Sequence, residues 1–268
     1  LVLSGDGSAT LSEADAGNNQ TEGWGATTDT INITGTGDFE VNLADAQIGA
    51  NGTENNVVAA KIDASGHTGK LTVDLGVVEL EHVSAKNWTG VDAIKLNTDD
   101  DDTTKLIDVA SGTEVIVAGL ENVANTLEID PNGSATGETL TVTLKHATAG
   151  SSVDLTSLVV DGFETLTINS TGTDSSSTTV ANVLDAIDGT TSDKTLKITG
   201  DKKLTATGVE ATWTTVTSTN TTGVDLTFDT GGGHTITGGS GADRFEFDTL
   251  ADITSLDSIN AGDGTDTL

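Results

Sequence analysis

The segment Gly238–Glu246 has the residue types and the spacing of a cation-binding turn. Its letters, GGSGADRFE, fit the nonapeptide pattern G-G-x-G-x-D-x-U-x, in which U is a large apolar residue. Glycines let the backbone turn tightly, so that carbonyl oxygens can point at a cation that a Cβ would obstruct. Asp243 supplies a carboxylate, and Phe245 begins a short strand whose side chain enters a core. We expect a cation to lie between successive turns with oxygen ligands from both, and such ligands suit calcium.

Partial copies of this pattern lie on both sides of it. The copy before it keeps Gly232 and has Ile236 at the apolar position. In the copy after it, Asp266 is the expected ligand, assisted by the carbonyl of Asp263, and Leu268 takes the apolar position. The alternative is a flexible Gly-rich acidic linker. Large apolar residues at the offsets of the repeat argue against that alternative.

With these motifs the chain resembles the repeats-in-toxin family, whose parallel β-roll binds calcium between turns. His234 stands where the family has Asp, and Asp229 or a backbone carbonyl is expected to compensate. The stretch Phe245–Ile259 is similar to the segment that follows the roll in bacterial surface-layer proteins and large secreted adhesins. The resemblance implies Ca²⁺ as the bound cofactor, with ligands from Asp229, Gly232, His234, Gly238, Gly239, Ser240, Gly241, Asp243, Asp248, Asp263 and Asp266.

The same resemblance also predicts how the protein is exported and assembled. It implies type I secretion through a C-terminal signal beyond these residues, and calcium-dependent assembly outside the cell. We therefore expect the chain to be a piece of a longer secreted protein.

A further acidic cluster lies in the first half of the chain, where Asp99, Asp100 and Asp101 are followed by Asp102. One interpretation is a solvated loop. The other is an additional calcium site, because adjacent carboxylates disfavour one another's ionised form unless a cation is present.

The elements that must position these residues are short strands. Apolar residues recur in alternating bursts such as Leu71-Thr72-Val73 and Leu166-Thr167-Ile168, commonly about ten residues apart, with Gly, Asn, Asp or Ser between them. We predict an all-β fold: a degenerate right-handed parallel β-solenoid over residues 1–200 that leads into a calcium-binding β-roll over residues 201–268. A β-sandwich of the adhesin type remains an alternative for the first half.

One short helix is also predicted. Thr178 or Thr179 can cap a segment in which Val180, Val183, Leu184 and Ile187 follow helical spacing, and Gly189 can end it. Its expected role is to cover the core between two layers of strands.

The composition excludes several classes of partner. The chain has 268 residues, with 42 acidic against 11 basic side chains and a net charge of -31. Nucleic acid and anionic membrane surfaces are disfavoured, because both require clustered Lys and Arg. The chain has no Cys, so disulfides and thiolate–zinc sites are excluded, and no apolar run is long enough for a membrane span. A chain this acidic could also be disordered. The recurring apolar bursts argue against disorder when calcium is present.

These observations predict a structural protein and not an enzyme. The histidines form no recognisable catalytic constellation, and no nucleophile-elbow or zinc-protease motif occurs. We expect an extracellular, calcium-dependent surface layer on a bacterial cell, in which the chain contacts copies of itself in a two-dimensional lattice and contacts cell-surface polysaccharide. The alternative is a secreted adhesin that binds carbohydrate or another surface, since Thr-x-Thr pairs recur and Trp24, Trp88 and Trp213 could be sugar platforms.

Overall fold

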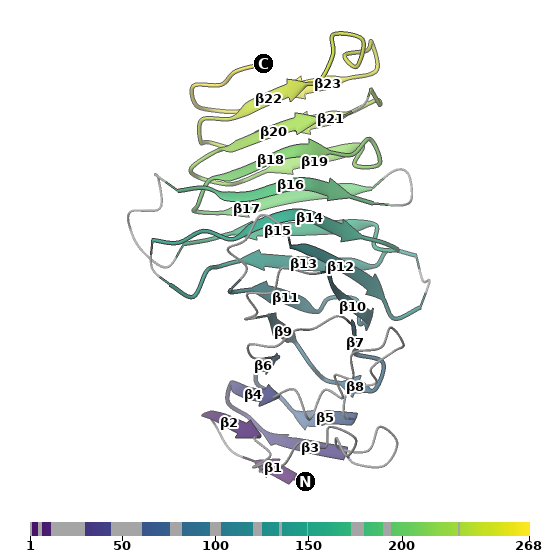
Figure 1. The fold of residues 1–268 in the computed structure, drawn as a ribbon, viewed down its shortest axis with the longest axis vertical. Helices are drawn as coiled ribbons and strands as arrows, with labels where there is room; N and C mark the ends of the chain where they lie inside the picture. The colour runs from purple at the N-terminus through teal and green to yellow at the C-terminus, as the bar shows by residue number, and fades with distance from the viewer. Residues whose placement is uncertain are drawn as a thin grey trace.

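A computed structural model shows an elongated stack of strands that runs from the N-terminal end to the C-terminal end of the chain (Figure 1). The structure describes residues 2–4, 7–11, 30–43, 61–75, 82–96, 103–119, 125–133, 136–148, 150–172, 180–189, 194–229 and 231–268. Within these ranges the chain contains strands and turns and no helix. Accordingly, the described part of the chain offers no helical segment that could cross a membrane.

The strands form three sheets, and the pairings within each sheet are parallel. Sheet A has the order β1 (Val2–Ser4), β3 (Thr30–Gly35), β5 (Lys61–His67) and β8 (Trp88–Thr89). Sheet B has the order β2 (Gly7–Leu11), β4 (Phe39–Leu43), β6 (Leu71–Asp74), β9 (Ala93–Leu96), β11 (Glu114–Val117), β13 (Thr139–Leu144), β15 (Thr165–Ser170), β17 (Thr195–Gly200), β19 (Thr215–Ser218), β21 (Thr235–Thr237) and β23 (Ser258–Asn260). Sheet C has the order β22 (Arg244–Phe247), β20 (Val224–Phe228), β18 (Leu204–Val209), β16 (Asn182–Asp188), β14 (Asp154–Val160), β12 (Thr126–Pro131), β10 (Thr103–Val109) and β7 (His82–Ser84).

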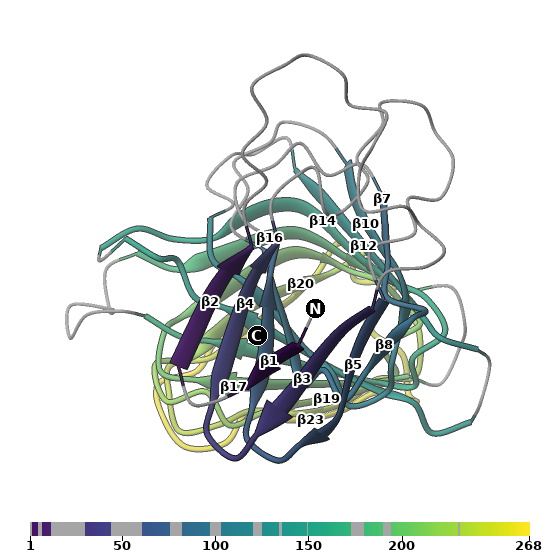
Figure 2. The same cartoon turned by 90° about the horizontal axis from the view of Figure 1, so that it is seen from below.

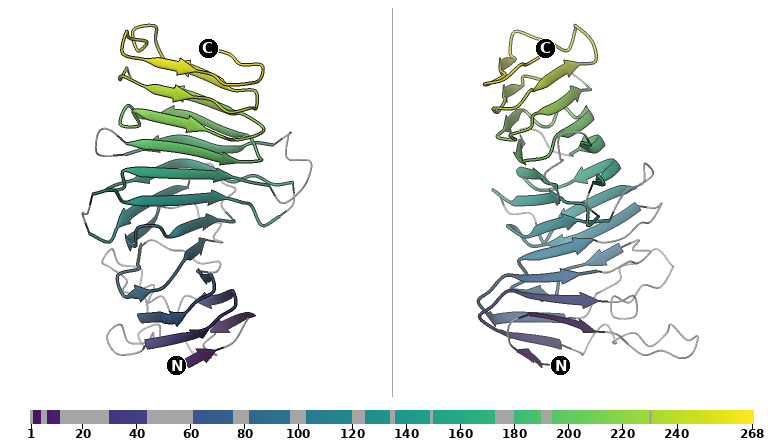
Figure 3. Two further views of the ribbon diagram at one scale, coloured as in Figure 1. Left: turned by 180° about the vertical axis from the view of Figure 1, so that it is seen from behind. Right: turned by 90° about the vertical axis from the view of Figure 1, so that its left-hand side faces the viewer.

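This arrangement is a parallel β-solenoid, as the sequence predicts. Successive coils contribute alternate strands to sheets B and C, so that the two long sheets face each other across one core (Figures 1 and 3). Along many of the strands, buried apolar residues alternate with residues that face outward, as in the pattern iBiBiB of β15. Apolar side chains stack in register up the solenoid, for example Leu140 on Leu166, Leu166 on Leu196 and Leu196 on Val216. The view along the stack shows the strands enclosing this core (Figure 2).

The parallel pairing excludes the alternative of a β-sandwich for the described part of the first half. Sandwiches of the adhesin type are built from antiparallel sheets, whereas β1, β3, β5 and β8 pair in parallel and so do β2, β4, β6 and β9. At the other boundary, sheets B and C continue across residue 200, since β16 pairs with β18 and β17 pairs with β19.

The predicted helix after residue 178 is wrong. Residues 182–188 form strand β16, and the described residues around them are not helical; residues 178 and 179 lie outside the described residues. Val180 is exposed and Val183 is only partly buried, so neither shares the inward face of Leu184 and Ile187.

A local irregularity of sheet C explains this error. Leu184 and Ile187 are both buried although three positions separate them, and they stack on Leu155 and Leu158, which have the same separation. β18 repeats this spacing at Ala206 and Val209, and it has one residue more than β20, whose paired Leu226 and Phe228 are two positions apart. Such an extra residue, as in a β-bulge, shifts the next inward side chain from the second to the third position. In a single sequence this spacing of three imitates one turn of helix.

Candidate metal centre

Carboxylates gather in three places along the solenoid. One is the turn before β22, where the sequence predicts calcium; we call Gly238–Asp243 together with Ala261–Asp266 the Asp243 corner. The second consists of Asp188, Glu210, Asp229 and Asp248, which we call the acidic rank. The third consists of Glu128, Asp130 and Asp161, which we call the acidic group.

At the Asp243 corner, a buried carboxylate joins two coils. The side chain of Asp243 is 1% exposed. Its Oδ1 accepts a hydrogen bond from the Val224 N–H at 2.9 Å, and its Oδ2 accepts one from the Gly239 N–H at 2.8 Å. The next coil repeats the contact, because the Asp243 N–H donates to Oδ1 of Asp266 at 3.0 Å. These carboxylates therefore cap turns as well as carrying charge.

Burial raises the pKa of the Asp243 carboxyl, the two amide hydrogen bonds oppose this shift, and the nearby Asp266 carboxylate adds to it. The environment thus disfavours the ionised form unless a cation compensates. An ionised carboxylate has about four lone-pair positions, of which the two amides use two. Both oxygens of Asp243 can therefore still coordinate a metal.

The glycines of the Asp243 corner permit a close approach of oxygens from successive turns. A Cβ added at Gly262 would lie 2.2 Å from the carbonyl oxygen of Gly239 and 2.8 Å from that of Gly238. A Cβ added at Gly264 would lie 2.2 Å from the carbonyl oxygen of Gly241 and 3.1 Å from Oδ1 of Asp266. The absence of a Cβ thus lets carbonyl oxygens of one turn pack closely against the next, and oxygens are the ligands that Ca²⁺ prefers, so the residues at this corner fit the ion.

The rest of the predicted ligand set is divided between the Asp243 corner and other parts of the solenoid. Ser240 and Asp263 belong to the Asp243 corner and are exposed, and the Asp263 N–H donates to the carbonyl oxygen of Gly239 at 2.9 Å. His234 is fully buried between Phe228 and Phe247, with Nδ1 3.2 Å from the carbonyl oxygen of Trp213.

Gly232 lies beside this imidazole, because a Cβ added there would be 3.3 Å from Nε2 of His234. Asp99, Asp100 and Asp101 lie outside the described residues.

Asp229 and Asp248 belong to the acidic rank, at the opposite end of the strands from Asp243. In register, Ile187 pairs with Val209, Val209 with Phe228, and Phe228 with Phe247, and each of these residues is followed directly by an acidic one. Neighbouring strands are about 4.8 Å apart, so the backbones of these acidic residues recur at that interval, and the Glu210 carboxylate accepts a hydrogen bond from the Gly189 N–H at 2.8 Å. Burial raises the pKa of Asp229, and the charges of Asp248, Asp188 and Glu210 raise it further.

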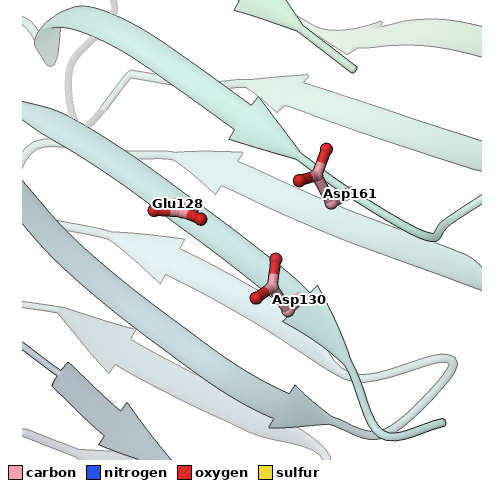
Figure 4. A group of neighbouring side chains, drawn as sticks. All are labelled: Glu128, Asp130 and Asp161. Carbon is pink, nitrogen blue, oxygen red and sulfur yellow. The ribbon is translucent and has the colours of Figure 1, made fainter. Parts of the chain in front are cut away.

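The acidic group was not predicted from the sequence. Glu128 and Asp130 both point outward from β12, and Asp161 directly follows β14, the next strand of sheet C (Figure 4). One carboxylate oxygen from each residue lies within 4.8 Å of the other two. Oδ1 of Asp130 and Oδ1 of Asp161 are buried and accept no hydrogen bond from any described group. This geometry makes the acidic group a possible metal-binding site with oxygen ligands.

One lysine partly neutralises the acidic group. Lys105 Nζ bonds to Glu128 and lies 3.1 Å from Oδ2 of Asp130. Burial lowers the pKa of Lys105, but its hydrogen bonds to Glu128 and Asp130 outweigh that effect and raise it. Three carboxylates and one ammonium leave a net charge of -2 when all four are ionised, which a divalent cation would balance.

Lys194 lies between the acidic group and the acidic rank, and its side chain points into the core. It is 1% exposed, its Nζ donates to the carbonyl oxygen of Val160 at 2.9 Å, and it lies 5.3 Å from the ring centroid of Trp213. Burial lowers its pKa, and the charges of Asp161, Glu164 and Glu210 oppose the shift. Its ammonium group donates inward, and the structure shows no salt bridge between a described lysine or arginine and a carboxylate of the rank.

The sequence contains the pattern of the acidic group, but the pattern cannot be recognised until the pairing of the strands is known. Acidic residues at alternate positions of one strand, followed by an acidic residue after the next strand of the same sheet, would identify it. The coil that separates Asp130 from Asp161 is 31 residues long, whereas Val224 follows Leu204 by 20, so the register had to be known first. Comparison with known proteins adds no relationship: no family model matches the chain, and neither a curated protein nor a solved structure matches it significantly.

Proposed function

We propose that this chain is a calcium-stabilised structural segment of a secreted bacterial surface layer, that it associates with copies of itself, and that it is not an enzyme. The acidic rank is the observation that carries the proposal. The solenoid register holds its carboxylates about one strand spacing apart, and the core side chains beside them fix that register. Like charges held at this distance oppose folding unless cations neutralise them.

Calcium fits this requirement better than other cations. Oxygens are the only ligand atoms at the acidic group, in the rank and at the Asp243 corner, and the chain has no Cys for a softer metal. Extracellular calcium modules bind in the range of about 10⁻⁴ to 10⁻³ M. Binding to the folded chain alone adds to its stability, by about 2.7 kcal/mol at a calcium concentration one hundred times Kd.

The solenoid suits a structural role outside the cell. Each coil packs mainly on its two neighbours, so such a fold forms a quasi-one-dimensional rod with flat faces. In a compartment with little calcium the carboxylates would repel one another and the chain would remain loose enough for export. External calcium would then fold it.

Calcium-dependent melting tests the metal part of the proposal. We expect calcium, added to chain stripped with EDTA, to raise the melting temperature followed by circular dichroism. Asp229→Asn should raise melting in EDTA, because it removes one like charge from the rank, and it should reduce the gain on adding calcium. Asp185→Asn is the matched control, since Asp185 is also exposed on sheet C and faces one like charge, that of Asp154, but lies outside the rank; it should leave the gain on adding calcium unchanged. A melting temperature that does not respond to calcium would refute the proposal.

Electron microscopy separates a layer protein from an adhesin. A layer protein should form ordered sheets when calcium is added and lose them with a chelator, whereas an adhesin should stay dispersed and bind its ligand. Trp88 and Trp213 are buried in the structure, so neither offers an exposed ring to a sugar, and Trp24 lies outside the described residues.

A further inference from the structure

The outward face of sheet B, from β13 to β23, is almost uncharged. Its outward residues form ranks that run across the coils, with Thr165 beside Thr195, Thr195 beside Thr215, and Thr215 beside Thr235. We call this surface the Thr face, and its residues are Thr139, Thr141, Thr165, Thr167, Asn169, Thr195, Lys197, Thr199, Thr215, Thr217, Thr235, Thr237, Ser258 and Asn260. At its margin Thr143 is buried and donates a hydrogen bond to Oε1 of Glu114. These strands place no acidic side chain on the Thr face, in a chain that has 42 acidic residues.

The surfaces around the Thr face are charged. The outward side of sheet C in the same coils bears Glu128, Asp130, Asp154, Asp185, Asp188, Asp225, Arg244 and Glu246. Lower on sheet B, Lys95 lies 2.6 Å from Asp74 and 3.7 Å from Glu40, and Lys70 lies 2.7 Å from Glu114. The neutrality therefore belongs to one face of particular coils and is not a property of the whole chain.

The Thr face is also regular and flat. Each of its strands turns its apolar residues into the core, so only short side chains and Lys197 stand on the outer side. One edge is fixed by side-chain hydrogen bonds, since Asn169 Nδ2 lies 3.5 Å from Oγ1 of Thr143 and Oγ1 of Thr199 lies 3.3 Å from Oδ1 of Asn169. Thr165, Thr195 and Thr215 make no side-chain hydrogen bond to another described residue.

We infer that the Thr face is the surface through which two copies of this chain associate face to face. This inference rests on the proposed function and identifies the surface by which the copies associate. Two chains with a net charge of -31 repel each other wherever carboxylates meet, and the Thr face is a surface where they do not. A second Thr face also has the same spacing of about 4.8 Å between ranks, so side chains can interdigitate along its whole length.

The size of the Thr face suits such a contact. Six strands of three to six residues cover roughly 30 by 15 Å, so two copies would bury on the order of 1,000 Å² together. This area is at the lower limit for a specific interface. We therefore expect association that is weak and reversible in solution and is reinforced in a layer by many neighbours.

A pair of charge variants tests the contact in saturating calcium by sedimentation. Thr165→Lys with Thr215→Lys places two charges on the Thr face, and Thr205→Lys with Thr227→Lys places two on sheet C. Both change the net charge from -31 to -29, which by itself would favour association equally. We expect the Thr-face variant to associate at least about tenfold more weakly than wild type and the sheet C variant to associate as wild type does. Thr235→Lys, at an exposed position near the edge of the sheet, repeats the test with less risk to the fold.

The outcomes separate this inference from the proposed function. A chain that melts higher in calcium yet stays monomeric overturns the Thr-face contact and leaves calcium stabilisation intact. Equal loss of association in both double variants also overturns it. A monomer that binds a glycan or slows ice growth through the Thr face, with that activity lost in Thr165→Lys with Thr215→Lys, would assign the surface to another partner. A chain without a calcium response that still associates through the Thr face would refute the proposed function alone.

Discussion

Asp243 has two roles in the structure, and two substitutions can separate them. It caps the turns of two coils through the N–H groups of Val224 and Gly239, and it offers free lone pairs to a cation. Asp243→Ala removes both roles. Asp243→Asn keeps one acceptor oxygen for a backbone amide but removes the charge that calcium requires.

The structure sets the magnitudes. Asp243→Ala leaves the buried Val224 N–H and the partly buried Gly239 N–H without an acceptor, and each such group costs about 1–3 kcal/mol, so the local loss should be about 2–6 kcal/mol even in EDTA. Asp243→Asn should lose about half as much in EDTA, because its one amide oxygen still accepts from one of the two N–H groups. In calcium the Asn variant should bind at least about tenfold more weakly, equivalent to about 1.4 kcal/mol.

Amide hydrogen exchange over residues 224–247 is the suitable assay, since a solenoid opens locally and a single melting temperature averages over its coils. Protection in EDTA reports the cap, and the additional protection in calcium reports the metal. If Asp243→Asn retains the whole calcium-dependent gain, Asp243 is only a cap and the reasoning about a metal ligand is refuted.

The remaining predictions concern pH, backbone strain and the core. Raised folded-state pKa values mean that Asp154, Asp229 and Asp243 hold protons more tightly than in the unfolded chain, so in EDTA their contribution to stability should rise as pH falls toward about 5. With calcium the trend should reverse, and melting curves between pH 7 and 5 check the sign. Gly223→Ala places a Cβ 2.1 Å from the carbonyl oxygen of Ala242 in the next coil, at a φ of 97°, whereas a Cβ at Gly112, at a φ of 86°, has no neighbour within 4 Å. In chemical denaturation, the free energy of unfolding should fall by several kcal/mol for Gly223→Ala and by about 1–2 kcal/mol for Gly112→Ala. Phe163→Ala, at a fully buried site, should lose about 3–5 kcal/mol in the same measurement, and a loss below about 1 kcal/mol would show that the coils can close the cavity.

The corner around Asp243 could be predicted because its signal is local. The glycines, the carboxylate and Phe245 lie within nine consecutive residues, and the chemistry of a tight turn constrains each of them. The solenoid was also predictable, since short strands such as Leu166-Thr167-Ile168 carry their own alternation of inward and outward residues.

The prediction from alternating inward and outward residues was wrong in β16, where two inward residues are three positions apart. Leu184 and Ile187 are three positions apart, β14 and β18 have the same spacing, and the extra residue shows only where β18 pairs with β20. A helical periodicity and a bulged strand give the same letters, and only the neighbouring strand distinguishes them.

By itself, the sequence determined that the chain has short strands, an acidic surface and one oxygen-rich turn centred on Asp243. Only the tertiary structure decided which distant carboxylates meet, as in the acidic group of Glu128, Asp130 and Asp161, and which face carries no acidic residue. The physical reason is that coil lengths vary, with offsets of 20, 23 and 31 residues between paired positions. The register between coils is set by the packing of core side chains across that variable distance, and local periodicity does not encode it.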